Sequence, residues 1–368
     1  MMIICLSAVA HADTVMDGDI IRVCPPVGIQ ARTAEFDANG IILTYFDSTA
    51  LWVYDVATDR RYPLPDSNPC TTNCRLSPDA RWITYFNDAT NAYNRMRLNG
   101  TERTLITAYA ADVEWWSDEM YLIWTPARSA YLRPLDADVR EYLTVPGVVS
   151  VQPGGRYAVL LQQDGDTFSR TLVNLAEPRE RVLLGEDRAY YNTQHWSPDG
   201  TWLAYVEPVG DDARITGELF GIQPGMMEPV QWTNFAAAYG AARINGIAVG
   251  DLAWSPDSQR IAFWVTEVTG ADPLANTGNA MIHVLDLSTN EITAYCGYST
   301  PDATPNPPRL SWSPDGRYLG FGGDVREDGR SYLLLALEVE TGVYTALSEG
   351  LFPAFGAPDV VAWGLPPG

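Results

Sequence analysis

The chain contains no lysine: all 24 of its basic residues are arginine, against 46 aspartate and glutamate residues in a length of 368. A Schiff-base lysine and the phosphate-binding lysines of Walker A and protein-kinase sites are therefore excluded. The formal charge of −22 also argues against nucleic acid and anionic membrane surfaces as partners, because both repel an acidic surface.

Histidine and familiar catalytic motifs are scarce as well. His195 and His283 are the only histidines after His11, which leaves little for a histidine-based metal site. No G-x-S-x-G, H-E-x-x-H or glycine-rich phosphate loop occurs, and the nearest serine motif, residues 297–301 (GYSTP), lacks the second glycine. We therefore expect no cofactor and no catalytic residue of these types. Two alternatives stay open, a carboxylate pair among the many acidic residues and calcium at Asp211-Asp212.

A long apolar run occurs only at the start of the chain. Residues 1–9 are apolar and Ala10-His11-Ala12 follows them, which fits the small-x-small cleavage pattern of a secretory signal. Residues 1–12 are thus predicted to be a signal peptide, with its basic region and natural start upstream; the alternative is a buried first strand. No other stretch approaches the ~18 apolar residues of a membrane span.

Cysteine use agrees with an oxidising compartment. Without Cys5 in the predicted signal, four cysteines remain, and four allow three pairings. Cys70 and Cys74 are close enough for a loop disulfide, whereas Cys24 and Cys296 would pair only if the chain ends meet. A lone C-x-x-x-C without a second pair or a nearby histidine favours no zinc site.

The chain repeats one short motif. A tight turn of serine, proline and aspartate follows an aromatic or aliphatic residue and precedes an alternating apolar strand, as in TWLAYV, QRIAFWV, RYLGFG and RWITYF. The four clear copies are Trp196-Ser197-Pro198-Asp199-Gly200, Trp254-Ser255-Pro256-Asp257-Ser258, Trp312-Ser313-Pro314-Asp315-Gly316 and Leu76-Ser77-Pro78-Asp79-Ala80.

Three degenerate copies bring the count to seven: residues 36–40 (FDANG), 116–119 (WSDE, beginning at Trp116) and 151–155 (VQPGG). The spacings between proline-equivalent positions are 40, 40, 35, 45, 58 and 58. Further strands and polar hairpin turns complete each unit, as in YLRPLDADVREYLTV and MIHVLDLSTNEITAY. Such periods suit four short strands per repeat.

These motifs resemble the TolB-like, or WD-like, repeats of bacterial exported proteins over roughly residues 33–350. The resemblance implies an all-β propeller of four-stranded antiparallel blades, seven by the count of repeats, with six or eight as alternatives. One propeller domain would span residues 13–368, with repeats starting near 33, 73, 113, 148, 193, 251 and 309. Residues 19–24 and 360–363 are expected to pair and close the ring, which removes the exposed edge strands. The location implied is periplasmic or extracellular.

The recurring tryptophan, proline and aspartate residues are expected to be structural, because one site does not need seven copies. The proline fixes φ, the aspartate bonds local backbone, and the glycine accepts a positive φ. The tryptophan should fill the gap between neighbouring blades. Trp116, Trp196, Trp254 and Trp312 are assigned this role.

Binding residues are expected on the opposite face, where the connections are long and irregular, since variable loops on a rigid scaffold tend to carry function. Tyrosine and arginine, which are enriched at binding hot spots, occur there. The candidates are Tyr190, Tyr191, Phe235, Tyr239, Arg243 and Tyr298, with His195 facing the channel. The competing interpretation is that the aromatics pack the loops onto the blades and that both histidines are structural.

Two functions follow. The first is a non-catalytic exported propeller that binds a protein, peptide or glycan through the loop-rich face. The second is a carbohydrate-active or other hydrolytic propeller, which would need carboxylates converging within ~5–10 Å at one mouth of the channel. Small apolar channel walls would contradict it. The sequence favours the first, and fold alone does not decide between them.

Overall fold

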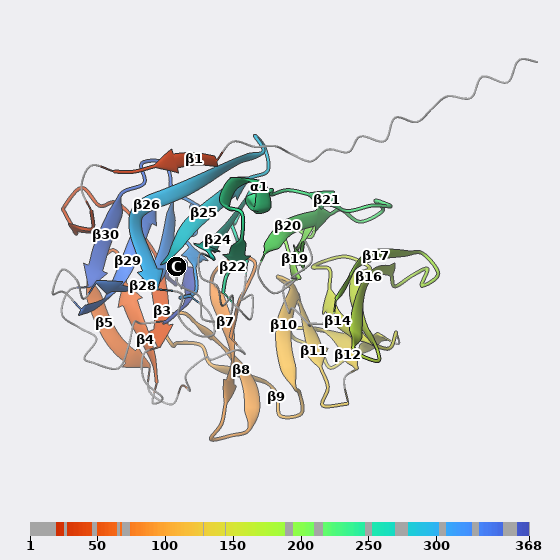
Figure 1. Cartoon of the computed structure of the whole chain (residues 1–368). Coiled ribbons are helices and arrows are strands. Elements are labelled where there is room, and N and C mark those ends of the chain that lie inside the picture. The colour runs from red at the N-terminus through yellow and green to blue at the C-terminus, as the bar shows by residue number, and fades with distance from the viewer. Residues whose placement is uncertain are drawn as a thin grey trace, which may run out of the picture.

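The computed structural model describes residues 20–25, 28–45, 50–64, 67, 74–127, 129–143, 145–187, 194–209, 216–246, 252–268, 279–301, 307–325, 331–348 and 359–367. Within these ranges the chain folds into seven β-sheets arranged around a common axis (Figure 1). No helix in the described part of the chain is both long enough and apolar enough to cross a membrane.

Each blade is built on four antiparallel strands, counted here from the channel outward; five sheets contain only these, whereas the sheet of blade 6 has six strands and that of blade 7 has five. Blades 1 to 3 are β31 (Asp359–Gly364), β3 (Ile41–Tyr45), β4 (Leu51–Asp55) and β5 (Arg60–Leu64); β6 (Arg75–Leu76), β7 (Trp82–Asn87), β8 (Ala92–Arg97) and β9 (Thr104–Thr107); β10 (Asp112–Ser117), β11 (Met120–Trp124), β12 (Ala130–Pro134) and β13 (Glu141–Leu143). Blades 4 and 5 are β14 (Val148–Val151), β15 (Tyr157–Asp164), β16 (Thr167–Asn174) and β17 (Arg181–Asp187); β18 (His195–Trp196), β19 (Leu203–Pro208), β20 (Gly217–Ile222) and β21 (Val230–Gln231). Blades 6 and 7 are β23 (Ala253–Trp254), β24 (Arg260–Glu267), β25 (Asn279–Asp286) and β26 (Glu291–Pro301); β27 (Ser311–Trp312), β28 (Tyr318–Val325), β29 (Ser331–Glu338) and β30 (Tyr344–Ser348).

The hydrophobic core is divided among the seams between blades. Seven clusters of buried side chains occur in the described residues, and each contains residues of two neighbouring blades. The cluster around Tyr54, Tyr318 and Trp363 joins blade 7 to blade 1, so the ring is closed. This confirms the predicted all-β propeller with seven four-stranded blades.

Both chain ends fasten the ring, but not to each other. The C-terminal β31 pairs antiparallel with β3 and supplies the innermost strand of blade 1. The N-terminal β1 (Ile20–Val23) adds a parallel strand to β26 at the outer edge of blade 6, and β2 (Gln30–Ala31) does the same to β30 of blade 7 (Figure 1). Closure by terminal strands is confirmed, whereas the expected pairing of 19–24 with 360–363 is wrong, because each end pairs with a different blade.

A disulfide between Cys24 and Cys296 holds this N-terminal segment in place. It joins residues 272 positions apart, with Cα atoms 5.0 Å apart, directly after β1. The Cys24–Cys296 pairing that the sequence left open is therefore present, and it depends on β1 lying beside β26 and not on the two chain ends meeting. The disulfide indicates an oxidising compartment, as in exported proteins. Cys70 and the signal region 1–12 lie outside the described residues, so the Cys70–Cys74 pair and the signal peptide stay predictions.

Blade 6 has a divided inner strand. Both β23 and β22 (Ala242–Ile244) pair with β24, at successive positions along the same edge. The short helix α1 (Phe235–Tyr239) precedes β22; Asn234 caps its N-terminus, and its first two backbone N–H groups donate to the Glu218 carboxylate. This additional structure contributes to the 58-residue spacing between repeats.

The repeated turn has the geometry that its residues predict. In blade 5 the Ser197 hydroxyl donates to the Asp199 carboxylate at 2.6 Å and accepts the Trp202 backbone N–H at 2.9 Å, while Gly200 adopts φ +70°. Ser77, Ser255 and Ser313 make equivalent pairs of bonds. Every Ser-Pro-Asp turn is thus built in the same way.

The tryptophans cross the seams, with one shift of position. Trp254 Nε1 donates to the His195 carbonyl at 3.1 Å, and Trp312 Nε1 donates to the Ala253 carbonyl at 2.8 Å. In blade 3 it is Trp115, not Trp116, that makes the equivalent bond, to the Arg75 carbonyl at 3.0 Å. The register of β10 shifts between residues 115 and 117, which moves Trp116 out of the repeat position.

Candidate functional site

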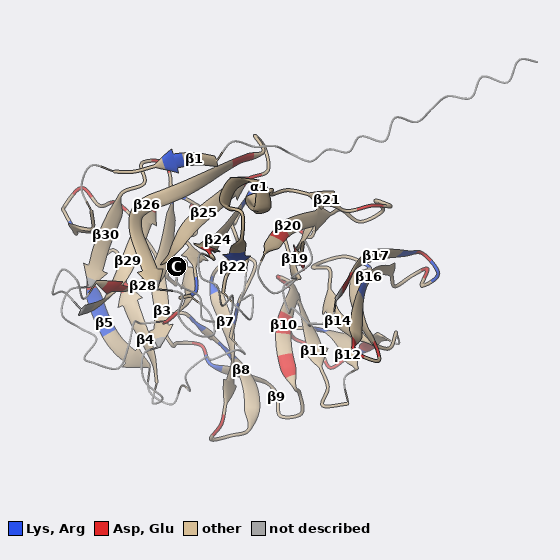
Figure 2. Cartoon of the chain, in the orientation of Figure 1, with Lys and Arg blue, Asp and Glu red and all other residues tan. Residues whose placement is uncertain are grey.

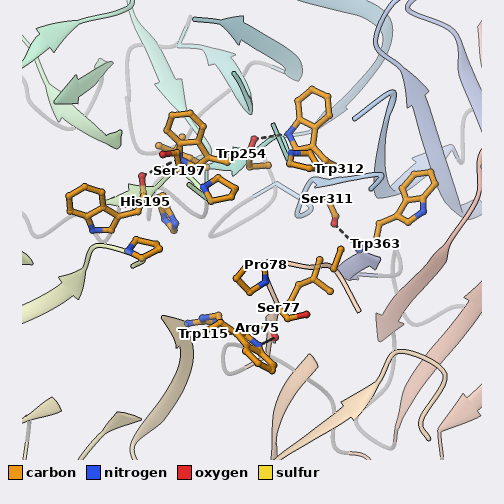
Figure 3. A pocket seen from close by; sticks show the side chains of 18 of the residues that line it. Arg75, Ser77, Pro78, Trp115, His195, Ser197, Trp254, Ser311, Trp312 and Trp363 are labelled. Carbon is orange, nitrogen blue, oxygen red and sulfur yellow. Dashed lines mark hydrogen bonds between the residues drawn. The ribbon is translucent and has the colours of Figure 1, made fainter. Parts of the chain in front are cut away.

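The axis of the ring holds a cavity of about 370 Å³, lined by side chains from all seven blades. Serine and proline residues of the repeat turns line it together with residues of the inner strands (Figure 3). The cavity therefore lies at the end of the channel where the uniform turns are, and not at the loop-rich face expected from the sequence. Its volume is within the range of small-ligand sites.

The indole rings and prolines give this cavity a rigid wall. Pro78, Pro153, Pro198, Pro256 and Pro314 line it, one from the repeat turn of each of blades 2, 4, 5, 6 and 7. Five tryptophans border it as well: Trp115, Trp196, Trp254, Trp312 and Trp363. The indole N–H groups of Trp115, Trp254 and Trp312 donate to backbone carbonyls of neighbouring blades (Figure 3). Residues assigned a structural role from the repeat thus also shape the cavity.

One position of each repeat determines the chemistry of the inner wall. The residue before the aromatic or aliphatic residue of the motif is Arg75 in blade 2, Glu114 in blade 3, His195 in blade 5, Ala253 in blade 6 and Ser311 in blade 7, and all five line the cavity. Blades 2, 3 and 5 contribute ionisable groups, whereas blades 6 and 7 contribute small side chains. The sequence predicted His195 toward the channel, and it lies there; Arg75 and Glu114 were missed.

Arg75, Asp112 and Glu114 form a charged group at the seam between blades 2 and 3, and Figure 2 shows acidic residues on β10. Arg75 Nη2 lies 3.3 Å from Asp112 Oδ2, and Nη1 donates to the Cys74 carbonyl at 3.2 Å. Glu114 Oε1 accepts the Trp124 indole N–H at 2.7 Å. One guanidinium therefore serves two carboxyl groups, of which Glu114 lines the cavity.

Burial raises the pKa of both carboxyl groups. Desolvation raises the pKa of Glu114 above its usual value, and the repulsion from Asp112 acts in the same direction. The pKa of Asp112 is raised for the same first reason, although Arg75 and the backbone N–H of Val113 oppose the shift. Perturbed carboxyl groups beside a cavity are typical of functional sites.

The loop residues predicted to bind are mostly buried. Phe235 is inaccessible to solvent, Arg243 is 3% exposed and Tyr298 is 6% exposed. Phe235 packs into the seam between blades 5 and 6, and Tyr298 into the seam between blades 6 and 7. These three side chains therefore stabilise the ring and do not form a contact surface; Tyr190 and Tyr191 lie outside the described residues.

Tyr239 and His283 form a structural pair. The Tyr239 hydroxyl lies 2.9 Å from His283 Nε2, and His283 Nδ1 lies 3.1 Å from the Met281 carbonyl. An Nδ1–H donor to the carbonyl leaves Nε2 to accept from Tyr239, so the ring is bonded on both sides in its neutral form. Desolvation lowers the pKa of His283 to about 4. The interpretation of His283 as a packing residue agrees with this burial.

Neither a metal centre nor a predicted calcium site can be assigned. In the described ranges no three His, Cys, Asp or Glu side chains gather in a group that could hold a metal ion. Asp211 and Asp212 lie outside those ranges.

Comparison with known proteins gives structural matches only. No protein-family model matches the chain, and no curated protein matches its sequence. The periplasmic gluconolactonase of Pseudomonas aeruginosa matches with a TM-score of 0.51 and 15% identity over 90% of this chain and 99% of that one. The oligogalacturonate lyase of Vibrio parahaemolyticus matches with a TM-score of 0.50 and 11% identity over 85% and 86%. TolB of Acinetobacter baumannii matches with a TM-score of 0.44 and 15% identity over 90% and 68%.

At such identities a structural match shows the fold and not the activity. The two matches with TM-scores of 0.50 and 0.51 are named a lyase and a gluconolactonase, and these names describe those proteins only. The chain is therefore structurally similar to the TolB-like β-propellers at low sequence identity, and its fold is a seven-bladed propeller.

Proposed function

We propose that this protein is an exported, non-catalytic propeller that binds a segment of a protein or peptide in its central cavity. The observation that carries the proposal is the cavity of about 370 Å³ to which all seven blades contribute. Its wall of prolines and hydrogen-bonded indoles is pre-formed, which lowers the entropic cost of binding. The Cys24–Cys296 disulfide supports a periplasmic or extracellular location.

The loop-rich face remains a second candidate surface for the same function. Much of it, including Tyr190 and Tyr191, lies outside the described residues, whereas α1 and its exposed residue Ala237 are described. A test should therefore compare the two ends of the channel directly.

Two matched substitutions make this comparison. Ala253→Phe places a large side chain in the cavity, and Ala237→Phe makes the same change on the exposed side of α1 at the other end. Peptides selected from a displayed library against the native chain should bind Ala253→Phe at least about tenfold more weakly and Ala237→Phe unchanged, because a filled pocket loses its hot-spot contacts. Unfolding midpoints serve as the folding control. The reverse pattern would assign binding to the loop-rich face, and failure to select any binder would contradict the proposal.

A carbohydrate-active propeller is the alternative function, and one observation favours it. Asp112 and Glu114 occupy alternate positions of β10, so both side chains leave one face of the strand, and both carboxyl groups have a raised pKa. Glycosidases also use two carboxyl groups, one of them an acid with a raised pKa. Release of reducing sugar from acidic or neutral oligosaccharides, lost in Glu114→Gln, would establish the enzyme and displace the binding proposal.

A further inference from the structure

The charged groups of the cavity are not balanced. Arg75 interacts electrostatically with Glu114 and is already engaged by the Asp112 carboxylate and the Cys74 carbonyl. Glu114 Oε1 accepts a hydrogen bond from the Trp124 indole N–H, and the Glu114 side chain lines the cavity. Arg75 thus carries one positive charge against two carboxyl groups, and a second positive charge beside Glu114 would balance them. Among the described residues, Arg75 is the one cation that acts on Glu114.

One other ionisable side chain lines the inner wall among the described residues. His195 comes from β18 of blade 5, whereas Glu114 comes from β10 of blade 3. The remaining lining of the wall is formed by proline, tryptophan, leucine, alanine and serine residues. Such a wall packs well against the methylene groups of a long side chain whose charged end points inward.

The charge of the whole protein acts in the same direction. A net charge of −22 without any lysine produces a field that attracts cations and repels anions. A carboxylate ligand would have to compete with Asp112 for Arg75 and enter against this field. A ligand with an ammonium or guanidinium group meets neither obstacle.

We propose that the cavity recognises a cationic group at the end of an apolar stem, with the Glu114 carboxylate as its direct partner. This inference rests on the proposed binding function and names the chemistry of its ligand. The source is a lysine or arginine side chain of a bound segment or a free alkyl amine, which share the same chemistry.

Calorimetric titration with paired probes tests the proposal. N-acetyl-lysine methylamide, its norleucine analogue and 1,4-diaminobutane differ in charge and in source while retaining a similar stem. The lysine probe should bind at least about tenfold more tightly than norleucine, which is the effect of one partly desolvated charge pair. Equal binding of lysine and norleucine, or tighter binding of N-acetyl-glutamate methylamide, would overturn the assignment.

Glu114→Gln and Glu119→Gln are the matched variants. The glutamine at 114 retains an oxygen for the Trp124 N–H, and Glu119 is an exposed residue of the turn in the same blade. The first should lose about tenfold in affinity for the lysine probe and keep its affinity for norleucine, while the second should behave as the native chain. Equal loss in both variants would contradict a direct role of Glu114.

The two proposals fail in different ways. If Ala253→Phe abolishes binding of selected peptides that carry no basic residue, the cavity binds peptides but the charge assignment is wrong. If 1,4-diaminobutane binds far more tightly than the lysine probe, with the same loss in Glu114→Gln, the cation site is supported and peptide binding is not.

Discussion

The seam between blades 4 and 5 and the seams on either side of blade 6 are held together by different interactions. At the seams around blade 6, Trp254 and Trp312 donate their indole N–H groups to backbone carbonyls of the preceding blade. Trp196 Nε1, at the equivalent position between blades 4 and 5, is buried and has no hydrogen-bond partner within the described ranges. A buried ion pair of Arg170 with Glu207 crosses this seam instead.

This comparison shows that the repeat specifies the blade more strictly than the contact between blades. The Ser-Pro-Asp turn depends on local bonds, which the motif supplies in every copy. The seam depends on residues outside the motif, and each pair of neighbours has its own. Gly185 illustrates the point, because any larger side chain there would collide with the Glu207 carboxylate.

The largest effect is expected from Glu207→Ala, which leaves the Arg170 guanidinium buried without its carboxylate. Arg170 is 4% exposed, so the loss should be about 3–5 kcal/mol in the free energy of unfolding measured with urea. Glu141→Ala is the control. Its partner Arg156 is exposed at the surface, so this substitution should cost less than about 1 kcal/mol. A similar cost for both variants would mean that the ion pair does not hold this seam.

At the outer edge of blade 6, removal of the Cys24–Cys296 disulfide should cost about 2–5 kcal/mol, because the link closes a very long loop in the unfolded chain. Cys24→Ser, Cys296→Ser and the double variant should lose the same amount, since each removes the same link. Thermal unfolding with and without reductant measures it. If reductant destabilises the double variant as much as the native chain, the effect comes from another bond.

Acid should lower the free energy of unfolding through His283, which lies on β25 of blade 6. Its pKa is about 4 in the folded protein and near 6.5 in the unfolded chain, so the unfolded state binds more protons between these values. This contribution is complete above pH 6.5 and is lost progressively as the pH falls toward 4, up to about 3 kcal/mol. His283→Gln should flatten the slope of unfolding free energy against pH in that window; an unchanged slope would assign the acid sensitivity elsewhere.

The smallest effect on stability is expected from a substitution in the Ser-Pro-Asp turn of blade 2. Ala80 adopts φ +56° where Gly200 and Gly316 adopt φ +70°. Ala80→Gly should therefore stabilise the protein by about 0.5 kcal/mol, because relief of the left-handed strain slightly exceeds the entropy cost of glycine. Ala237→Gly in α1, where the backbone is helical, should instead destabilise it. Melting temperatures of both variants would show whether the turn is strained.

The sequence predicted what is local and repeated, and it was less informative about what is unique. The motif, its strands and the blade count follow from residues such as Ser197 and Asp199, whose bonds reach only a few positions along the chain. Trp115 was overlooked because a bulge, invisible in the sequence, decides which of two adjacent tryptophans faces the seam. Phe235 and Tyr298 were expected to bind because they occur in long connections, but tertiary packing, which the sequence does not reveal, buries both side chains.

Arg75 and Glu114 escaped notice for the opposite reason. The motif draws attention to what the repeats have in common, while the channel chemistry depends on the position at which they differ. Comparison of the residue before the motif aromatic across the seven repeats, from Arg75 and Glu114 to Ala253 and Ser311, would have identified the inner wall.

The attachment of both chain ends to different blades also has a consequence for the order of folding. β1 and β2 have no partner until β26 and β30 exist, and blade 1 lacks its inner strand until β31 is available. The first strands must therefore wait for the last ones, and contacts between such distant positions are slow to form. If the chain is exported with its N-terminus first, the ring can close only after β26, β30 and β31 have also crossed the membrane.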